Sequence, residues 1–238
     1  MKHIVKPLAR GIAVSLMLVA MAACTRTEVK QGQANTSGRL ARPDVVMISD
    51  YTFNPSLVKL DAGVAQRVVR AVGSETDAQK QAAIVKRVAD AVSEDLVKEV
   101  RKLGFTAART SSGTAVTGGT QFFITGQFMT IDEGNETRRN IIGLGAGASE
   151  VKADTQFLYR TPDGTTQRLQ TFVADAQSGR KPGAAETLGA GAALGMVAAS
   201  DVASEKLGAD VKSLGEKMAG EIAKQLAELF KQQGWVLK

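Results

Sequence analysis

The stretch Val151–Asp175, VKADTQFLYRTPDGTTQRLQTFVAD, decides the fold. In its first ten residues, small or apolar side chains alternate with polar ones and occupy one side: Val151, Ala153, Thr155, Phe157 and Tyr159. A period of two is typical of a strand with one buried face. Thr161-Pro162-Asp163-Gly164 predicts a turn, because proline fixes φ and glycine accepts positive φ. The stretch is therefore predicted to be a β-hairpin, with Thr165–Asp175 as its second strand.

The strand before this hairpin has a different pattern. Thr120–Asp132, TQFFITGQFMTID, carries Phe and Ile on both sides, which is typical of a central strand covered on both faces. Further upstream, the short apolar run Asp44–Ile48 predicts a buried first strand.

Two long helices are expected on either side of these strands in the sequence. Apolar residues recur at helical spacing over about 76–103 and again over about 201–233. Both segments end in glycine and an aromatic residue, Gly104-Phe105 and Gly234-Trp235, and glycine is common just after a helix. We expect each helix to lead into a short strand. The pattern predicts an α/β fold, a mixed sheet with two long helices packed on it, in one domain over 44–238.

The first 23 residues are typical of a bacterial signal peptide. Three basic residues precede an uncharged apolar run over 11–23, which is too short for a spanning helix of about 20 residues. The run ends in Met21-Ala22-Ala23-Cys24, and small residues before a cysteine resemble the lipobox of bacterial lipoproteins. We expect Cys24 to carry several acyl chains, which anchor a protein stably. An ordinary secretory signal with an incidental cysteine is the alternative.

The residues after Cys24 predict where the protein lies. Thr25 stands where inner-membrane lipoproteins typically carry aspartate, so by this analogy we expect the periplasmic face of the outer membrane. Residues 24–43 are rich in Gly, Ser, Thr, Gln and Asn and predict a flexible tether. The expected organisation is a signal peptide over 1–23, a tether over 24–43 and a periplasmic α/β domain over 44–238.

Composition excludes several function classes. The only histidine is His3, in the signal, and the only cysteine is Cys24, so the mature domain has neither an imidazole nor a free thiol. This excludes Ser-His-Asp and Cys-His catalysis and zinc sites built from histidine or cysteine. Loss of three basic residues with the signal leaves 27 basic against 24 acidic residues, and with 5% aromatic residues no nucleic-acid surface is expected. We expect no catalytic site, no cofactor and no metal; Asp132–Glu136 lacks the ligand ladder of a calcium loop and predicts a turn.

The stretch Arg138–Ser149, RRNIIGLGAGAS, either binds a phosphate or forms a turn. A dinucleotide fingerprint needs a helix after its glycines, because the helix N-terminus meets the phosphates. Here the strand from Val151 follows instead, and no lysine completes a P-loop. We therefore expect a structural role, in a turn between two strands, for Gly143, Gly145 and Gly147.

A second small-residue segment has two interpretations. Gly191, Gly195 and Ala199 recur every four residues, a spacing that permits close helix contact. The apolar stretch is about 14 residues long and cannot span a bilayer. It is either a loop packed on the core or a surface for self-association or membrane contact.

Several motifs together resemble those of one bacterial lipoprotein family. They are Arg139-x-x-x-Gly143-x-Gly145-Ala146-Gly147-x-Ser149-x-Val151, Ser178-Gly179-x-x-Pro182-Gly183, the glycine–alanine segment and Gln233-Gly234-Trp235. On these motifs, residues 44–238 resemble the family catalogued as domain of unknown function 4410. The resemblance implies an envelope location and brings no catalytic residues. The order of strands and helices is also similar, more distantly, to periplasmic lipoproteins related to curli-secretion channel subunits.

The sequence thus predicts a lipid-anchored envelope protein that acts as a binding or assembly component and is not an enzyme. Its expected partners are the membrane, through the N-terminal lipid, and an envelope protein or a second copy of the chain. One alternative is a self-assembling subunit of an envelope or secretion complex that uses Gly191, Gly195 and Ala199. The other is a carboxylate-dependent hydrolase.

Overall fold

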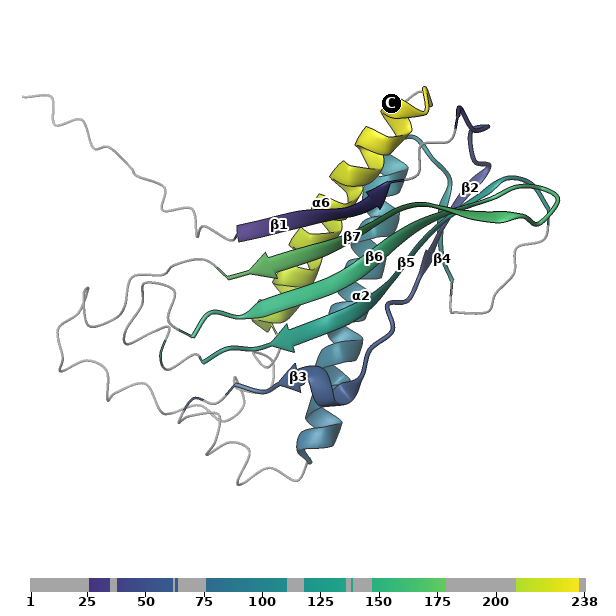
Figure 1. Cartoon of the computed structure of the whole chain (residues 1–238). Coiled ribbons are helices and arrows are strands. Elements are labelled where there is room, and N and C mark those ends of the chain that lie inside the picture. The colour runs from purple at the N-terminus through teal and green to yellow at the C-terminus, as the bar shows by residue number, and fades with distance from the viewer. Residues whose placement is uncertain are drawn as a thin grey trace, which may run out of the picture.

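The computed structural model of the 238-residue chain contains one α/β domain. It describes residues 26–34, 38–61, 63, 76–110, 118–135, 138, 147–178 and 209–235. Within these ranges two long helices pack on a seven-stranded mixed sheet (Figure 1). The predicted fold class is confirmed.

The sheet is antiparallel on one side and parallel on the other. Its strands are β1 (Arg26–Ala34), β2 (Val45–Ser49), β3 (Val58–Lys59), β4 (Ala107–Thr110), β5 (Gln121–Asp132), β6 (Glu150–Arg160) and β7 (Thr166–Gln177). They lie in the order β1-β7-β6-β5-β2-β4, and β3 also pairs with β5. The pairs among β1, β7, β6 and β5 are antiparallel, whereas β2, β3 and β4 run parallel to their neighbours. The predicted hairpin is β6–β7, and its turn contains Gly164 at φ 90°.

Both helices lie on one face of the sheet (Figure 1). A short 3-10 helix, η1 (Pro55–Leu57), precedes α2 (Asp77–Lys102), and α6 (Ala209–Gln232) comes last. α2 begins with a capping box, in which the side chains of Thr76 and Gln79 each accept a hydrogen bond from the other residue's backbone. After Leu103 the chain leaves the helix through Gly104 at φ 87° and enters β4, as predicted. The strand expected after Trp235 lies outside the described residues.

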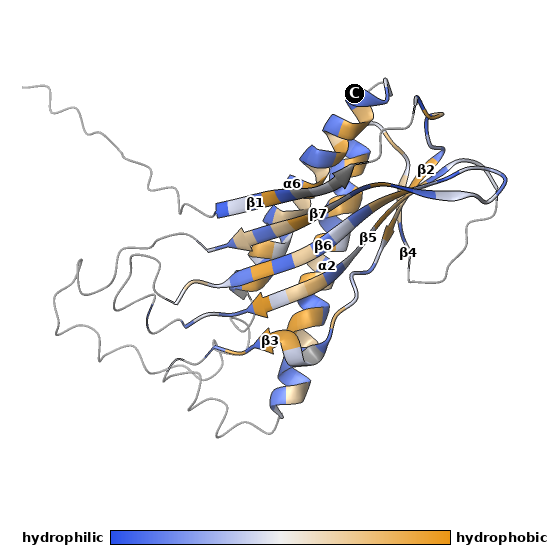
Figure 2. Cartoon of the chain, in the orientation of Figure 1, coloured by the Kyte–Doolittle hydropathy of each residue, from blue (hydrophilic) through white to orange (hydrophobic). Residues whose placement is uncertain are grey.

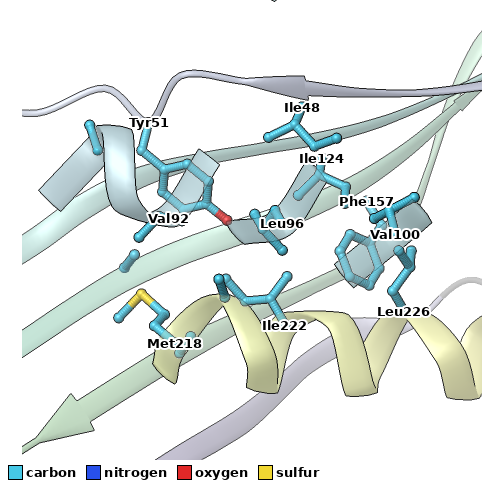
Figure 3. Packing of buried hydrophobic residues seen from close by; sticks show 14 of the residues in the cluster. Ile48, Tyr51, Val92, Leu96, Val100, Ile124, Phe157, Met218, Ile222 and Leu226 are labelled. Carbon is cyan, nitrogen blue, oxygen red and sulfur yellow. The ribbon is translucent and has the colours of Figure 1, made fainter. Parts of the chain in front are cut away.

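The core forms between the helices and the inner face of the sheet. Figure 3 shows side chains of β2, β5 and β6 facing the stripes of both helices. The fully buried members that it labels include Ile48, Ile124, Phe157, Val92, Leu96, Val100, Met218, Ile222 and Leu226. The helical spacing of apolar residues read from the sequence therefore marks the helix faces that pack against the sheet and against each other.

The opposite face of the sheet carries no helix among the described residues, and we call it the helix-free face. β5 is a central strand, as predicted from Thr120–Asp132. The prediction that both of its faces are covered is not confirmed, because only one face carries helices in the described ranges. Phe122, Ile124 and Phe128 are buried on the helix side, whereas Met129 is 46% exposed. Figure 2 shows polar and apolar residues interspersed along these strands. Two-sided hydrophobicity in β5 thus arises from a row of apolar residues on the helix-free face, described below.

The predicted flexible tether is the main correction to the sequence analysis. Arg26–Ala34, within the expected tether 24–43, forms the nine-residue strand β1 and pairs antiparallel with β7. Its glutamines and threonine fit a strand because the neighbouring β7 supplies hydrogen-bond partners for the backbone. Composition identified polar residues correctly but did not reveal this partner, which comes much later in the chain, at Thr166–Gln177.

Residues 38–43 are also fixed in place. The backbone N–H of Leu40 donates to Gln233 Oε1 at 2.8 Å, and Trp235 Nε1 donates to the carbonyl oxygen of Leu40 at 3.0 Å. Tyr159 Oη donates to the carbonyl oxygen of Ala41 at 2.9 Å. Residues 38–43 are therefore held against the end of α6 instead of acting as a spacer.

Candidate functional site

The sheet has two ends, which differ in their position relative to Cys24. The proximal end is where β1 begins, and its cross-strand row contains Arg26, Gln177, Glu150, Asp132 and Lys59. The distal end is where β2, β4 and β5 begin, beside the C-terminal part of α6. Because β1 begins two residues after Cys24, the proximal end is the part of the described sheet closest in sequence to the predicted lipid.

Charged residues cover the proximal half of the helix-free face. Three consecutive cross-strand rows alternate with core-facing residues and so point away from the helices. The charged members of these rows are Arg26, Lys59, Asp132 and Glu150 in the first, Glu28, Lys152 and Asp175 in the second, and Lys30 and Asp154 in the third. Positive and negative side chains are thus nearly balanced and form a mixed surface with little net charge.

Lys152 holds the centre of this surface together. Its Nζ lies 3.1 Å from Asp175 Oδ2 and 3.2 Å from Glu150 Oε1. The hydrogen bond to Asp175 raises the pKa of Lys152 above its ordinary value; burial opposes this and the bond to Glu150 adds to it. The ammonium group therefore stays charged and links β6 to Asp175 of β7 at the proximal end.

An apolar row crosses the helix-free face beyond the charged half. Ala108, Met47, Phe123 and Leu158 are direct neighbours on β4, β2, β5 and β6. Met47 is buried, whereas the other three are partly buried. The face therefore combines mixed charges with one apolar row, as protein interfaces combine an apolar core with a polar rim.

Glycine backbone closes the proximal end between β5 and β6. Gly134 and Gly147 have φ of 73° each, and Asn135 N donates to the carbonyl oxygen of Gly147 at 3.0 Å. A Cβ on Gly147 would come within 2.5 Å of the carbonyl oxygen of Asn135, and a Cβ on Gly134 would collide with the carbonyl oxygen of Gly147. Side chains are excluded at both positions because the two backbones touch.

Buried polar groups accompany these glycines. Glu133 and Ser149 are buried, and Ser149 Oγ donates to the carbonyl oxygen of Glu133 at 2.7 Å. Asp61 is also buried; its backbone N–H donates to Glu133 Oε2 at 3.1 Å, and its carboxylate accepts from Gly63 N at 2.6 Å. The stretch Asp132–Glu136, which the sequence predicts to be a turn, thus contributes the buried carboxylate of Glu133. This carboxylate joins the residues after β3 to the end of β5.

The edge strand β4 is tied to the helix layer by one arginine. Arg109 donates from Nε to Asp50 Oδ1 and from Nη2 to Asp90 Oδ1, the second at 2.6 Å. Asp90 also accepts from Lys86 Nζ at 2.6 Å. Burial raises the pKa of Asp90, but the hydrogen bonds from Lys86 and Arg109 outweigh it and lower the pKa below the ordinary value. This cluster joins β2, β4 and α2, and it has a structural role.

Most of the residues singled out in the sequence analysis lie outside the described ranges. They are Cys24, Gly143, Gly145, Gly191, Gly195 and Ala199. Gly147 is described, and its positive φ and close backbone contact are those of a turn glycine; the role of the loop as a whole stays a prediction.

Neither a metal cluster nor a membrane-spanning helix occurs in the described part of the chain. Those residues hold no group of three or more His, Cys, Asp or Glu side chains placed to bind a metal ion. No helix among them is long and apolar enough to cross a membrane.

Sequence reasoning did not single out β1 or the helix-free face. The alternation Arg26-Thr27-Glu28-Val29-Lys30 is a two-residue period and was the available signal, but its single apolar residue makes it weak. The buried Glu133 had no signal in the sequence, because a glutamate in a polar stretch is usually solvated.

Comparisons with known proteins identify a family and one distant structural match. Residues 46–195, more than half of the chain, match the family model described as Domain of unknown function (DUF4410). This confirms the predicted resemblance over that range; the closing Gln233-Gly234-Trp235 lies beyond it. No curated protein matches the sequence.

Among solved structures, a chain of the PelC dodecamer from Paraburkholderia phytofirmans is similar at 13% sequence identity. The match covers 80% of this chain and 98% of that chain, with a TM-score of 0.30. A TM-score this low does not assign the assembly of that protein to this chain. The predicted likeness to curli-secretion channel subunits is not tested by these matches.

Proposed function

We propose that this chain, which belongs to the family described as Domain of unknown function (DUF4410), is a lipid-anchored protein at the periplasmic face of the bacterial outer membrane. In this proposal it has no catalytic role. It holds an ordered sheet directly at the membrane surface and acts by assembling with protein partners there.

The observation that carries the proposal is the position of β1. Cys24 completes a lipobox-like sequence, and β1 begins at Arg26. Only Thr25 separates them, and one extended residue spans at most about 3.6 Å. A lipid on Cys24 would therefore hold the proximal end of the sheet within a few residues of the membrane, without a flexible spacer.

A short connection of this kind favours assembly. Copies anchored to one membrane are confined to its surface, so their effective concentration is higher than that of free copies and association costs less. The helix-free face supplies a surface for a protein partner. Its proximal half carries charges of both signs, some of them held in ion pairs, and the apolar row that contains Met47, Phe123 and Leu158 lies beyond them. These features support a binding or assembly role over that of an enzyme on a long tether.

The test compares two single substitutions in cells. Cys24→Ser removes the acylated atom, and we expect the protein to move from the membrane fraction to the soluble periplasm and to lose labelling by a radioactive fatty acid. Thr25→Asp keeps the lipid, and we expect it to move the protein to the inner membrane by the sorting analogy. Equal membrane retention and labelling of Cys24→Ser would contradict the lipid anchor.

A self-assembling subunit is the second candidate, and the edge position of β1 favours it. No strand lies beyond β1 among the described residues, so one side of its backbone is available for another strand. The segment at Gly191, Gly195 and Ala199 is a separate proposed contact. In this proposal Gly191→Leu with Gly195→Leu abolishes association while the circular dichroism spectrum stays unchanged, whereas a loop packed on the core would instead lose folded yield.

A further inference from the structure

The open edge of β1 has a charge pattern that restricts what can pair with it. Arg26, Glu28 and Lys30 alternate in sign and point to the helix-free face, whereas Val29 packs against the core on the helix side. Arg26 Nη2 lies 3.0 Å from Glu28 Oε2, and both side chains are well exposed. Lys30 is exposed and has no ion pair within the described ranges. The strand is thus long enough to pair with another strand and is charged in a specific order.

We propose that β1 pairs antiparallel with β1 of a second copy of this chain, about a two-fold axis at Val29. This inference rests on the proposed assembly function and names its partner. In this arrangement Glu28 of each copy lies opposite Lys30 of the other, and the two Val29 side chains meet on the helix side. The two seven-stranded sheets become one continuous sheet.

Side-chain geometry leaves few registers to consider. Opposite residues of an antiparallel pair lie on the same face, and a slip of one residue would turn the helix face of one copy to the helix-free face of the other. A two-fold axis at Glu28 or at Lys30 places like charges directly opposite, which destabilises a pair. An axis at Thr27 pairs only Arg26–Glu28 of the described strand. The axis at Val29 pairs Arg26–Gly32 of both copies and brings only opposite charges together.

The same pattern disfavours other partners. Charged residues on an edge strand normally prevent pairing with unrelated strands, and here the charges match only a strand with the complementary order. Because both copies present the same strand, the complement is the chain itself. Contacts between α6 and β1 place a helix beneath the edge, so both helix layers lie on one side of the joined sheet.

Charge exchange between two neighbouring positions tests this arrangement. In the full-length protein extracted from membranes in detergent, Glu28→Lys places two lysines opposite each other, and Lys30→Glu places two glutamates opposite each other. Each change converts two symmetric attractions into repulsions, so we expect dimerisation to weaken on the order of tenfold or more. The double variant restores opposite charges and should restore the wild-type dissociation constant. Arg168→Glu, an exposed charge reversal on β7, is the matched control and should leave association unchanged.

Sedimentation velocity over a range of concentrations measures these constants. Wild-type protein that stays monomeric, or a double variant no better than either single variant, would overturn the pairing. Circular dichroism of each variant shows that loss of association is not loss of folding. As a second measurement, Val29→Cys should form a disulfide-linked dimer in intact membranes, whereas Asp163→Cys at the exposed hairpin turn should not. These results are independent of the anchor, since a monomer that stays in the membrane fraction removes the pairing and leaves the proposed anchoring intact.

Discussion

The two ends of the sheet are closed by different kinds of contact. At the distal end, aromatic rings fill the space between α6 and the strands: Phe230 lies 4.3 Å from Phe105, 5.3 Å from Phe122 and 4.9 Å from Trp235, between ring centroids. At the proximal end, glycine backbones touch and buried polar groups bond to each other. Large side chains leave a signal in a sequence, but contacts between backbones do not. The distal end is therefore the predictable one.

The largest effect of a substitution on the free energy of unfolding is expected at the distal end. Phe230 is fully buried among three aromatic rings, so Phe230→Ala should lower the free energy of unfolding by about 3–5 kcal/mol through lost burial and the cavity left behind. Phe53, which is 38% exposed, supplies the matched control, and Phe53→Ala should cost far less. Urea denaturation of both variants makes the measurement. Equal losses would show that the aromatic cluster does not close this end.

The next effect tests the glycine contacts at the proximal end. Gly147→Ala forces positive φ on alanine and drives Cβ against the carbonyl oxygen of Asn135, so we expect a loss of about 1–3 kcal/mol. Gly164→Ala has a similar positive φ without a close backbone neighbour and should lose less. Thermal denaturation of the pair separates steric contact from backbone strain. If Gly164→Ala is the more damaging change, the backbone contact at Gly147 is not what closes this end.

A smaller, pH-dependent effect is expected at the β4 edge. Arg109→Ala removes a partner of Asp90 and Asp50, and because these side chains keep contact with water we expect a loss of about 1 kcal/mol near pH 7. The folded pKa of Asp90 is lowered, so this stabilisation is present above the unfolded value of 3.8 and is lost as the pH falls through the folded value. The difference between wild type and variant should therefore shrink below about pH 3.8. Lys86→Ala, which removes the other partner of Asp90, should show the same trend; a difference that is constant with pH would contradict the role of Asp90.

The smallest effect on stability is expected at the β1 edge. Lys30 is exposed, so Lys30→Ala should change the free energy of unfolding by no more than about 0.5 kcal/mol. The same variant should weaken self-association, because it removes both symmetric pairs with Glu28. Urea denaturation measures the free energy of unfolding, and sedimentation velocity on the same preparation measures self-association. A marked loss of stability would mean that Lys30 supports the monomer and not the edge contact.

The sequence predicted the parts of the fold that depend on repeated apolar spacing. The helical spacing of apolar residues over about 76–103 and the alternation of Val151–Arg160 appear in the structure as buried faces. The tether prediction was wrong over residues 26–34 and 38–43; its signal was missed because β1 has few apolar residues and depends on backbone pairing with β7. The candidate surface was not predictable, since Lys59, Glu150 and Asp175 come to lie on one face only when distant strands pair.

Amide hydrogen exchange across β1 tests the central claim, that an ordered strand follows the predicted anchor residue directly. In the full-length protein in detergent, alternate amides of residues 26–34 donate to β7 and should exchange slowly. If copies pair through β1, the remaining alternate amides should also become protected as the protein concentration rises. Exchange at every amide of residues 26–34 at the rate of an unstructured peptide would contradict both the strand and the function proposed for it.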